Sequence, residues 1–359
     1  MASALNCSQF TVPFPEPGTD EAGNYTIPWL IDTLVLAYRP YHYYLLTSIV
    51  IFSFFTNILI VIVLSHKEMR HSGVNVTMLI ISICDVACAL AGLVQLYLRN
   101  YSVGYSSYLT AYIQITVDYL YSAFHAASLY LAIGMAFCRV MSLKASNQNR
   151  DQWQSPVYAL RMAAAMCTFA FTFRINNIFL NGVKETEKDG IYMEVTDLAI
   201  ANGCLYLKIS VVSNAVISKL VPCLSMILLS IMILKRMAQA RRSAVQSRTN
   251  NEDKIERSSR FIKVILGVFV LCEAPQGIYL VIGGFVIVDH LNYIQRLSIF
   301  MNILAYVNTT TTFIIYSSLS GKFRKLFFQI FLPRYVAEKI YKGRSTLVVQ
   351  SVAHSSQAV

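Results

Sequence analysis

The chain has 359 residues, of which 55% are hydrophobic and 14% are charged. Soluble domains carry about 25% charged residues, so this composition excludes a soluble globular domain and indicates a membrane protein. The net charge of +11 does not indicate a nucleic-acid partner, because the basic residues cluster on alternate loops, with nine between 235 and 263 and seven after 320. By the positive-inside rule, these segments face the cytoplasm and the N-terminus lies outside.

Apolar runs of about 20 residues, long enough to cross a bilayer, recur seven times. We therefore predict an all-α membrane protein, a seven-transmembrane helix bundle with a short amphipathic cytoplasmic helix, whose spans lie at 44–65, 74–98, 110–143, 157–180, 209–238, 259–288 and 294–319. The membrane domain then covers 44–319, between an extracellular tail at 1–43 and the amphipathic helix and cytoplasmic tail at 320–359. We expect a multi-pass protein of the plasma membrane whose first span directs its insertion, because no charged segment with an apolar core opens the chain.

Glycosylation sequons agree with this orientation, because three of them begin on the predicted outside, at Asn6, Asn24 and Asn100. Six of the eight cysteines fall in spans, where they pack as small apolar groups. Only Cys7 and Cys204 lie clearly outside. An extracellular disulfide, if one forms, is therefore expected between these two, and no cysteine spacing in the sequence is typical of a metal site.

Polar residues inside three of the spans are expected to meet, because lipid offers them no partner. The first span carries Asn57, the second carries Asp85, and the last carries Asn308 with four threonines, Thr309 to Thr312. They predict a buried cluster around Asp85 that holds waters or a sodium ion. The alternative interpretation is purely structural contact between helices, although a two-state bundle also needs polar contacts that exchange.

The third span presents four polar side chains at spacings that place them broadly on one helical face: Asp118, Tyr121, Ser122 and His125. Asp118 is suited to a cationic ligand group, but an acid at the mouth of a span is as often simply solvated. The loop at 181–208 carries five acids and three lysines, which predicts either a mildly acidic lid for a basic ligand or an ordinary solvated loop.

Two ionisable residues lie deep in the fifth and sixth spans. Lys219 precedes Pro222, and Glu273 precedes Pro275 in an apolar run. A buried lysine needs an acid, so we expect Lys219 and Glu273 to pair across the two helices. The alternative is a neutral glutamic acid beside a proline that serves only helix packing.

The segments between and after the last spans suggest partners on the cytoplasmic side. The basic loop that begins at Lys235 would bind either anionic lipid or a docking protein. Apolar and basic residues alternate at helical spacing from Gly321 to Phe328, as in a helix that lies on the inner leaflet. The polar tail offers phosphorylation sites, and no catalytic motif, cofactor motif or transporter-like repeat appears in the sequence, so we expect no enzyme.

Taken together, the pattern resembles rhodopsin-like G-protein-coupled receptors over about residues 38–332. The matching positions are Asn57, Asp85, Arg139, Pro222, Pro275 and Tyr316, and Phe323 starts the amphipathic helix. Together with Asn308 and with Thr312, which departs from the usual Asn-Pro before Tyr316, these positions are assigned to switching and G-protein coupling. The chain departs from the pattern where Glu273 replaces the usual tryptophan, Cys138 the usual acid, and Gln114 lies near the usual disulfide cysteine. Because Cys138 replaces the usual acid before Arg139, the resemblance implies raised basal signalling, unless another acid takes that role.

The segments Glu273–Ile278 and Lys322–Arg324 look like the signatures of invertebrate myosuppressin and FMRFamide-like peptide receptors, a branch that nematodes have expanded as the Srw type. The resemblance implies a short peptide ligand that ends in Arg-Phe-amide. It also implies a heterotrimeric G protein of the Gi/o type as partner, with arrestin binding after tail phosphorylation.

Placed on this chain, the resemblance gives the ligand's arginine an acid, either Asp118 or Glu273, depending on whether Lys219 neutralises the latter. Its phenylalanine would enter an aromatic floor of Tyr121, Tyr279 and Tyr306, near Ser122, and the amide would bond to His125, Gln276 and Asn302. Two alternative functions stay open: a chemosensory receptor for a small molecule, and an ion-coupled transporter with a relay through Asp85, Lys219 and Glu273.

Overall fold

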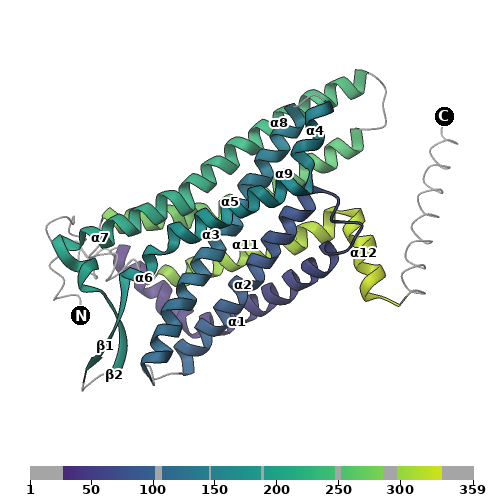
Figure 1. Cartoon of the computed structure of the whole chain (residues 1–359). Coiled ribbons are helices and arrows are strands. Elements are labelled where there is room, and N and C mark those ends of the chain that lie inside the picture. Colours follow the sequence, from purple (N-terminus) through teal and green to yellow (C-terminus); the bar gives the residue numbers. More distant parts are fainter. Residues whose placement is uncertain are drawn as a thin grey trace.

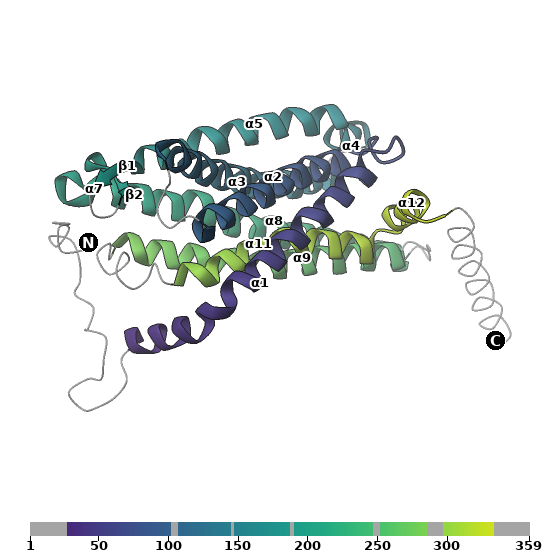
Figure 2. The same cartoon turned by 90° about the horizontal axis from the view of Figure 1, so that it is seen from below.

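The computed structural model describes residues 27–101, 107–144, 147–186, 190–246, 252–285 and 297–333. Seven long helical segments within these ranges run side by side and form an elongated bundle, which confirms the expected all-α architecture (Figures 1 and 2). They are α1 (Ile27–Leu64), α2 (Gly73–Tyr101), α3 (Tyr108–Lys144), α5 (Pro156–Arg174), the run of α7 (Asp197–Ala215), η3 (Val216–Leu220) and α8 (Val221–Gln246), then α9 (Glu252–Phe285) and α11 (Ser298–Leu319). Helix α7 is interrupted by a kink of non-helical residues at 201–204.

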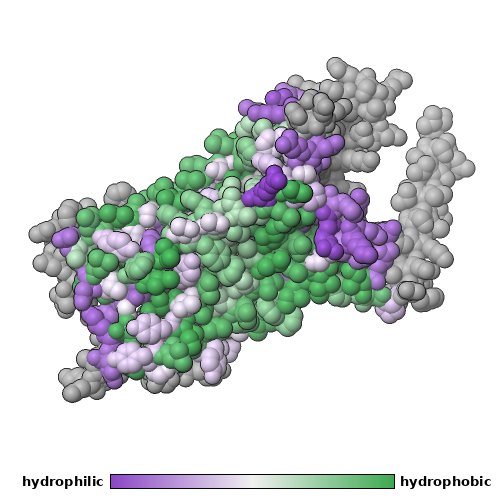
Figure 3. All heavy atoms as spheres, viewed as in Figure 1, coloured by the Kyte–Doolittle hydropathy of each residue, from purple (hydrophilic) through white to green (hydrophobic). Residues whose placement is uncertain are grey.

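The surface of the bundle is that of a protein solvated by lipid. In the described part of the chain, six helical segments are long and apolar enough to cross a membrane, and α11 adds a seventh apolar helix of 22 residues. Large apolar side chains point outward along these helices, among them Leu224, Leu228, Leu271 and Ile278. Figure 3 shows hydrophobic residues over the body of the bundle and hydrophilic residues gathered towards its ends.

The first helix is longer than the sequence analysis predicted. We expected the first span to begin at residue 44 after an extended tail, but α1 is already helical from Ile27. Pro40 lies inside it, where the missing N–H removes one helical hydrogen bond. The helix bends in its N-terminal third, so this part leans away from its neighbours (Figure 2). Part of the predicted tail is therefore an extension of the first helix, on which Tyr38 stacks against Phe300 of α11.

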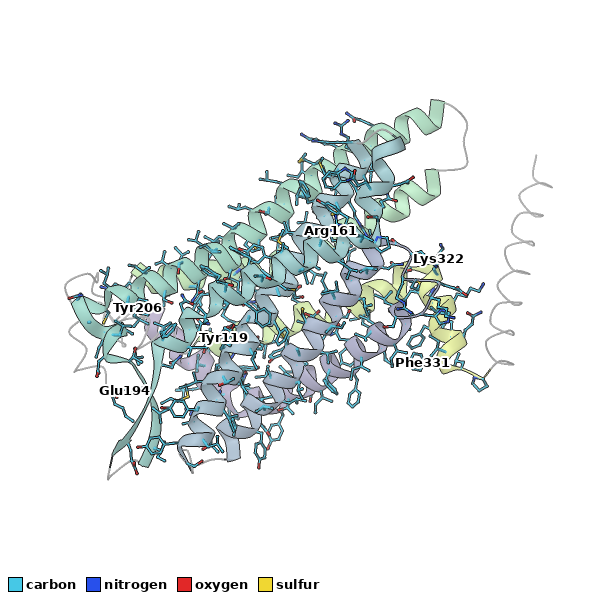
Figure 4. All side chains as sticks on the ribbon, viewed as in Figure 1. Tyr119, Arg161, Glu194, Tyr206, Lys322 and Phe331 are labelled. Atoms are coloured by element: carbon cyan, nitrogen blue, oxygen red, sulfur yellow. The ribbon has the colours of Figure 1, made fainter. Side chains whose placement is uncertain are left out.

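The segment after α5 forms a β-hairpin that sequence periodicity did not reveal. The short helix α6 (Asn176–Leu180) leads into β1 (Asn181–Thr186), which pairs antiparallel with β2 (Gly190–Val195). The ammonium of Lys184 lies 3.0 Å from Glu194 and 3.2 Å from Asp197. Its hydrogen bond to Glu194 has the larger effect and that to Asp197 the smaller, and both raise the pKa of Lys184. We call this end of the bundle the hairpin end; Figure 4 shows Glu194 there, far from Lys322.

The opposite end, which we call the α12 end, carries two short helices. The helix α4 (Asn147–Gln154), which the sequence analysis did not predict, precedes α5. Helix α12 (Gly321–Phe331) follows α11 almost at once, and the hydroxyl of Ser320 caps it by accepting from the N–H of Phe323. Helix α12 is thus the amphipathic helix expected from the sequence, and Figure 4 places Lys322 and Phe331 on it.

The fold around α12 depends on buried apolar contacts. Phe323 is fully buried and packs with Ile60, Val63 and Leu64 of α1 in the largest apolar cluster of the described residues. Arg324 donates to the carbonyl of Ser317, one of the last carbonyls of α11, which otherwise would lack a helical partner. The short helix is therefore fixed to both the first and the last helices of the bundle.

Several expected features fall where the structure gives partial information. Cys204 is disulfide-bonded, whereas the other six cysteines in the described residues are free. Its expected partner Cys7 lies outside the described residues, as do the sequon residues Asn6 and Asn24. Asn100 lies in the last turn of α2, and its side chain is not described, nor is that of Tyr316 in α11.

Replacing Phe323 by alanine should lower the stability of the bundle by about 3 kcal/mol, because a fully buried aromatic ring leaves a cavity. The matched control is Phe331→Ala at the other end of the same helix, where the side chain is 40% exposed. Thermal unfolding of the purified protein in detergent measures both. Equal shifts for the two variants would contradict the packing of Phe323 into the core.

Candidate functional site

An ion pair lies at the centre of the bundle, where the carboxylate of Glu273 has no solvent-exposed surface. Lys219 Nζ is 2.7 Å from Glu273 Oε2, and Glu273 is 0% exposed. This contact joins η3 to α9 and matches the pairing expected from the sequence. A buried charge is costly in the membrane unless it is paired and hydrogen-bonded, so the geometry around this pair decides whether it is stable.

The remaining hydrogen-bonding capacity of the pair is filled by three more residues. Lys219 also bonds to Gln276 Oε1 at 2.8 Å and to His125 Nε2 at 2.9 Å. The second oxygen of Glu273 accepts from Asn308 Nδ2 at 2.9 Å. We call these five residues the central hub; they link α3, η3, α9 and α11.

The protonation of His125 follows from the lysine. An ammonium has three N–H donors and no acceptor, and the three groups within reach of Lys219 are Glu273, Gln276 and His125. Nε2 of His125 must therefore accept, which places the ring proton on Nδ1 and leaves the ring neutral. The approach of His125 Nε2 to Glu273 Oε1 at 3.5 Å is then no ion pair, and the hub holds one cation and one anion.

Local irregularities in the helices place the hub residues. Pro222 cannot donate to the carbonyl of Ser218, and the helix widens here into the π-helical turn η3, which contains Lys219. The hydroxyl of Tyr130 on α3 donates to the carbonyl of Ile217 at 2.6 Å, so this distorted turn keeps its backbone satisfied. A π-turn shifts the side chains that follow it, and here it directs the lysine into the bundle.

A glycine lets the two helices of the ion pair come close. A Cβ atom on Gly277 would lie 3.0 Å from Leu220 Cδ2 and 3.1 Å from Lys219 Cβ, tighter than ordinary contacts. Pro275 lies two residues earlier, inside α9. The sequence Pro275–Gly277 thus permits the approach of α9 to η3 that the short lysine–glutamate distance requires.

An aromatic floor lies against the hub on α3 and α11. The ring of Tyr121 stacks on His125 with centroids 6.1 Å apart and lies 5.5 Å from the ring of Tyr306. The hydroxyl of Tyr306 lies over Gly92 of α2, where any side chain would collide with it. Two of the three tyrosines expected to form such a floor are therefore adjacent, and Tyr279 and Asn302 are half-buried on α9 and α11.

The other polar residues of α3 turn towards different neighbours rather than towards one common point. Asp118 accepts hydrogen bonds of 2.6 Å from Gln95 of α2 and from Gln114 of its own helix. Ser122 instead accepts from Asn177 of α6 at 3.0 Å. Residues that lie broadly on one face of α3 thus contact separate neighbouring helices, here α2 and α6.

A second polar cluster surrounds Asp85, nearer the α12 end. Asp85 accepts from Ser128 of α3 at 2.8 Å, while Asn57 donates to Ser53 and, at 3.4 Å, to the carbonyl of Thr309. No described hydrogen bond joins Asp85 directly to Asn57, so the expected cluster is divided into two neighbouring groups. Among the described residues, no group of three metal-binding side chains occurs. A sodium ion near Asp85 therefore stays a prediction.

A cavity of about 80 Å³ connects the hub to this cluster, with room for several water molecules. Its polar lining includes Asp85, His125, Asn308 and Thr312, and its apolar lining continues to Met135 and Ile265. Arg139, half-buried, lies near the end of α3 beside Cys138, whose thiol contacts Met162. Three of the residues assigned to switching, Asp85, Asn308 and Thr312, thus line one cavity.

The sequence analysis assigned no role to several polar residues at the hairpin end. Arg174, in the last turn of α5, is only 8% exposed. Asn177 bonds to Ser122 and to Asn214 of α7. The signal was present as the run Arg174-Ile175-Asn176-Asn177 inside an apolar span, where unpaired polar residues are costly.

A comparison with protein families identifies the architecture. Residues 44–333 match the family model described as "Serpentine type 7TM GPCR chemoreceptor Srw". The chain belongs to this family. Membership makes it a multi-pass membrane receptor with a ligand and a G-protein partner, and favours a receptor over the alternative of a transporter.

Individual relatives of this Srw-family chain are receptors of low identity to it. It is 23% identical to the "G-protein coupled receptor dmsr-1" of Caenorhabditis elegans over 358 residues, which covers 83% of this chain and 69% of that protein. It is also 23% identical to the "Sex peptide receptor" of Drosophila melanogaster over 337 residues, 86% of this chain and 76% of that protein. The resemblance inferred from motifs is confirmed at the level of the family.

Breaking the central ion pair on one side should destabilise this Srw-family receptor by about 3 kcal/mol, because the other charge stays buried without its partner. Lys219→Met and Glu273→Gln test this separately. The double variant should be less destabilised than the sum of the two, since neither charge then remains. Thermal unfolding in detergent measures all three, and strictly additive effects would contradict the pairing.

Adding a methyl group at Gly277 should push α9 away from η3 and cost about 1–3 kcal/mol. The control is Gly267→Ala on the same helix, where nothing lies within 4 Å of the added Cβ. That control should be neutral or slightly stabilising, because alanine favours helix by about 1 kcal/mol over glycine. Thermal unfolding of the two variants separates the effect of close packing from that of helix propensity. A stabilised Gly277→Ala variant would contradict the close packing of α9 against η3.

Proposed function

We propose that this Srw-family receptor binds a short amidated peptide ending in Arg-Phe-amide and signals through a heterotrimeric G protein of the Gi/o type. The name of one relative, the "Sex peptide receptor", supports a peptide ligand, and the branch-like motifs at Glu273–Ile278 and Lys322–Arg324 support the Arg-Phe-amide class. The observation that carries the proposal is the acid, Asp118, one helical turn from the aromatic floor that Tyr121 and Tyr306 form.

The central hub decides which acid receives the ligand's arginine. Glu273 already accepts from Lys219 and Asn308 and is fully buried, so a guanidinium would have to break two charged or polar contacts to reach it. Asp118 lies closer to the hairpin end and is bonded by neutral amides. We therefore assign the arginine to Asp118 and give Glu273 the role of holding the helices together until the ligand arrives.

A ligand bound on the hairpin side of the hub could pass its signal through the hub to the α12 end, where the G protein would bind. The ring of Tyr121 stacks on His125, which bonds to Lys219, so a phenylalanine on the aromatic floor would press directly on the hub. Separation of Lys219 from Glu273 would release α9 from η3, two segments whose close approach depends on Gly277. A movement of this kind is a switch between two discrete packings rather than a gradual deformation.

We further propose that the receptor lies in the plasma membrane with the hairpin end outside and the α12 end in the cytoplasm. The distribution of Lys and Arg along the loops supports this orientation. Arg139 and the basic segment after Lys235 would then face the G protein, and the tail after α12 would be open to phosphorylation and arrestin.

The family description supports a second candidate, a chemosensory receptor for a small molecule. Both candidates would use the same region around Asp118 and the aromatic floor, and the same G-protein partner. They differ in whether a peptide with a cationic side chain is required, and thus in whether Asp118 matters.

A G-protein activation assay in cells that express the full chain tests the proposal, with Arg-Phe-amide peptides, their free acids and analogues in which alanine replaces arginine. We expect an amide-dependent response at low concentration that shifts at least about tenfold in Asp118→Asn, since a charge-assisted hydrogen bond is lost. Asp197→Asn, an exposed acid at the same end, is the control.

Unchanged potency of the peptides on a well-expressed Asp118→Asn variant would overturn the assignment of the ligand's arginine to Asp118. If no peptide activates the receptor although its surface expression is confirmed, the small-molecule receptor becomes the favoured function. Reporters for different Gα classes, read in parallel, decide whether the coupling is of the Gi/o type.

A further inference from the structure

Helix α12 has three different faces, and one of them is charged. Phe323 and Leu326 are buried against the bundle, whereas Phe331 is 40% exposed on another side of the helix. Lys322 and Lys325 lie on the third side, three residues apart, and both are exposed. An amphipathic helix at a membrane surface holds its apolar face against the acyl chains and its cations among the lipid headgroups. The two lysines are therefore at the level of the headgroups.

The turn between α1 and α2, which spans residues 65–72 and which we call the 65–72 turn, presents two more cations. Met69 in its middle is 3% exposed, while Lys67 and Arg70 on either side of it are exposed. The N–H groups of Met69 and Arg70 donate to the carbonyl of His66, and Asn75 of α2 donates to the carbonyl of Met69. The backbone that carries the two cations is thus fixed by hydrogen bonds.

One apolar cluster joins this turn to α12. Met69 belongs to the same cluster of buried side chains as Leu64 of α1 and as Phe323 and Leu326 of α12. The four cations are one or two residues from these buried side chains, so they surround the same junction at the α12 end, where Figures 1 and 3 show hydrophilic residues beside α12. We call these four residues the basic patch: Lys67, Arg70, Lys322 and Lys325.

No acid neutralises the basic patch within the part of the chain that the structure describes. None of its four side chains forms an ion pair with a described residue. Glu68 is the one acid in the two segments that carry the patch. Arg324 of α12 adds a further cation, whose guanidinium donates to the carbonyl of Ser317. The patch therefore has an excess of positive charge on a fixed framework, which favours an anionic partner with several charges.

The place of the basic patch at the membrane surface selects the kind of anion. Ile330 and Phe331 are 39% and 40% exposed on the same short helix as the two lysines. A phospholipid can cover these apolar side chains with its acyl chains while its headgroup contacts the cations, whereas a soluble anion would satisfy the charges alone. Four cations exceed the single net charge of a phosphatidylserine headgroup, so an inositol headgroup with several phosphate charges is the better match.

We propose that the basic patch is a binding site for the phosphorylated inositol headgroup of a membrane phospholipid, whose phosphates lie between the 65–72 turn and α12. The site goes beyond the proposed function, because it involves neither the peptide ligand nor the G protein. A lipid bound there joins the two segments across the outside of the cluster that contains Phe323. Because it binds the folded bundle, it also stabilises the receptor against unfolding.

Binding is tested on the purified full chain in detergent by native mass spectrometry with three lipids: phosphatidylinositol 4,5-bisphosphate, phosphatidylserine and phosphatidylcholine. We expect the bisphosphate to bind more tightly than phosphatidylserine, and phosphatidylcholine to bind least. Two double variants, Lys322→Gln/Lys325→Gln and Lys67→Gln/Arg70→Gln, should each weaken binding of the bisphosphate by about tenfold or more, since each removes two cations that contact the headgroup.

The matched control is Lys144→Gln/Arg161→Gln, which removes two exposed cations of α3 and α5 outside the basic patch. It makes the same change in net charge and should bind the bisphosphate like the wild type. Thermal unfolding in phosphatidylcholine nanodiscs, with and without the bisphosphate, gives a second readout. The lipid should raise the unfolding temperature of the wild type and the control, and raise it less in the two patch variants.

The substituted side chains of the patch are exposed and lie on two separate segments, so a folding defect in one double variant leaves the other to decide the proposal. Unchanged binding in a folded patch variant would overturn the site. An equal loss in the control would overturn it too, because the attraction would then belong to the basic surface as a whole.

Phosphatidylserine that binds as tightly as the bisphosphate would overturn the choice of headgroup. If the patch variants bind the bisphosphate normally but activate the G protein less, the patch docks a protein instead, and the lipid site is overturned. Lipid binding is measured without peptide and without G protein, so its failure is distinguishable from failure of the proposed function.

Discussion

The ion pair between Lys219 and Glu273 is the constraint on which the rest of the bundle depends. Two charges placed in the apolar centre of a membrane protein are tolerated only if every donor and acceptor is matched. The lysine has three donors and three acceptors around it, and the glutamate receives Asn308 on its second oxygen. Four helical segments therefore meet at one point with fixed relative positions.

The irregular parts of the helices are explained by this requirement. Pro222 and the π-turn η3 bring the lysine inward, and Gly277 removes the side chain that would hold α9 away from it. The same hub separates the region proposed to bind the ligand, with Asp118 and the stacked Tyr121, from the cavity beside Asp85. A signal that crosses the bundle must pass through contacts that are all satisfied in this state, so it has to exchange partners rather than merely loosen them.

Much of this organisation was accessible from single residues, and some was not. The pairing of Lys219 with Glu273 was predictable from the sequence, because a charged residue inside a membrane needs a partner of opposite charge. Asn308 was assigned to the cluster around Asp85, yet it bonds to Glu273, because a residue on α11 can face either group and spacing alone does not choose. The β-hairpin carried too little alternation to be recognised, and α1 extends through Pro40 because the lost hydrogen bond costs less than ending the helix.

The sequence by itself determined the membrane class, the seven apolar spans, the amphipathic helix after α11 and the presence of two buried charges that need each other. These follow from composition and period, which act along the chain. Only the tertiary structure decided that Asp118 and Ser122 face different helices, and that the Nε atom of Arg174 is buried without a hydrogen-bond partner. Whether a polar group is satisfied depends on which side chains from distant helices reach it, and this is set by helix rotation and close approach that no local pattern encodes.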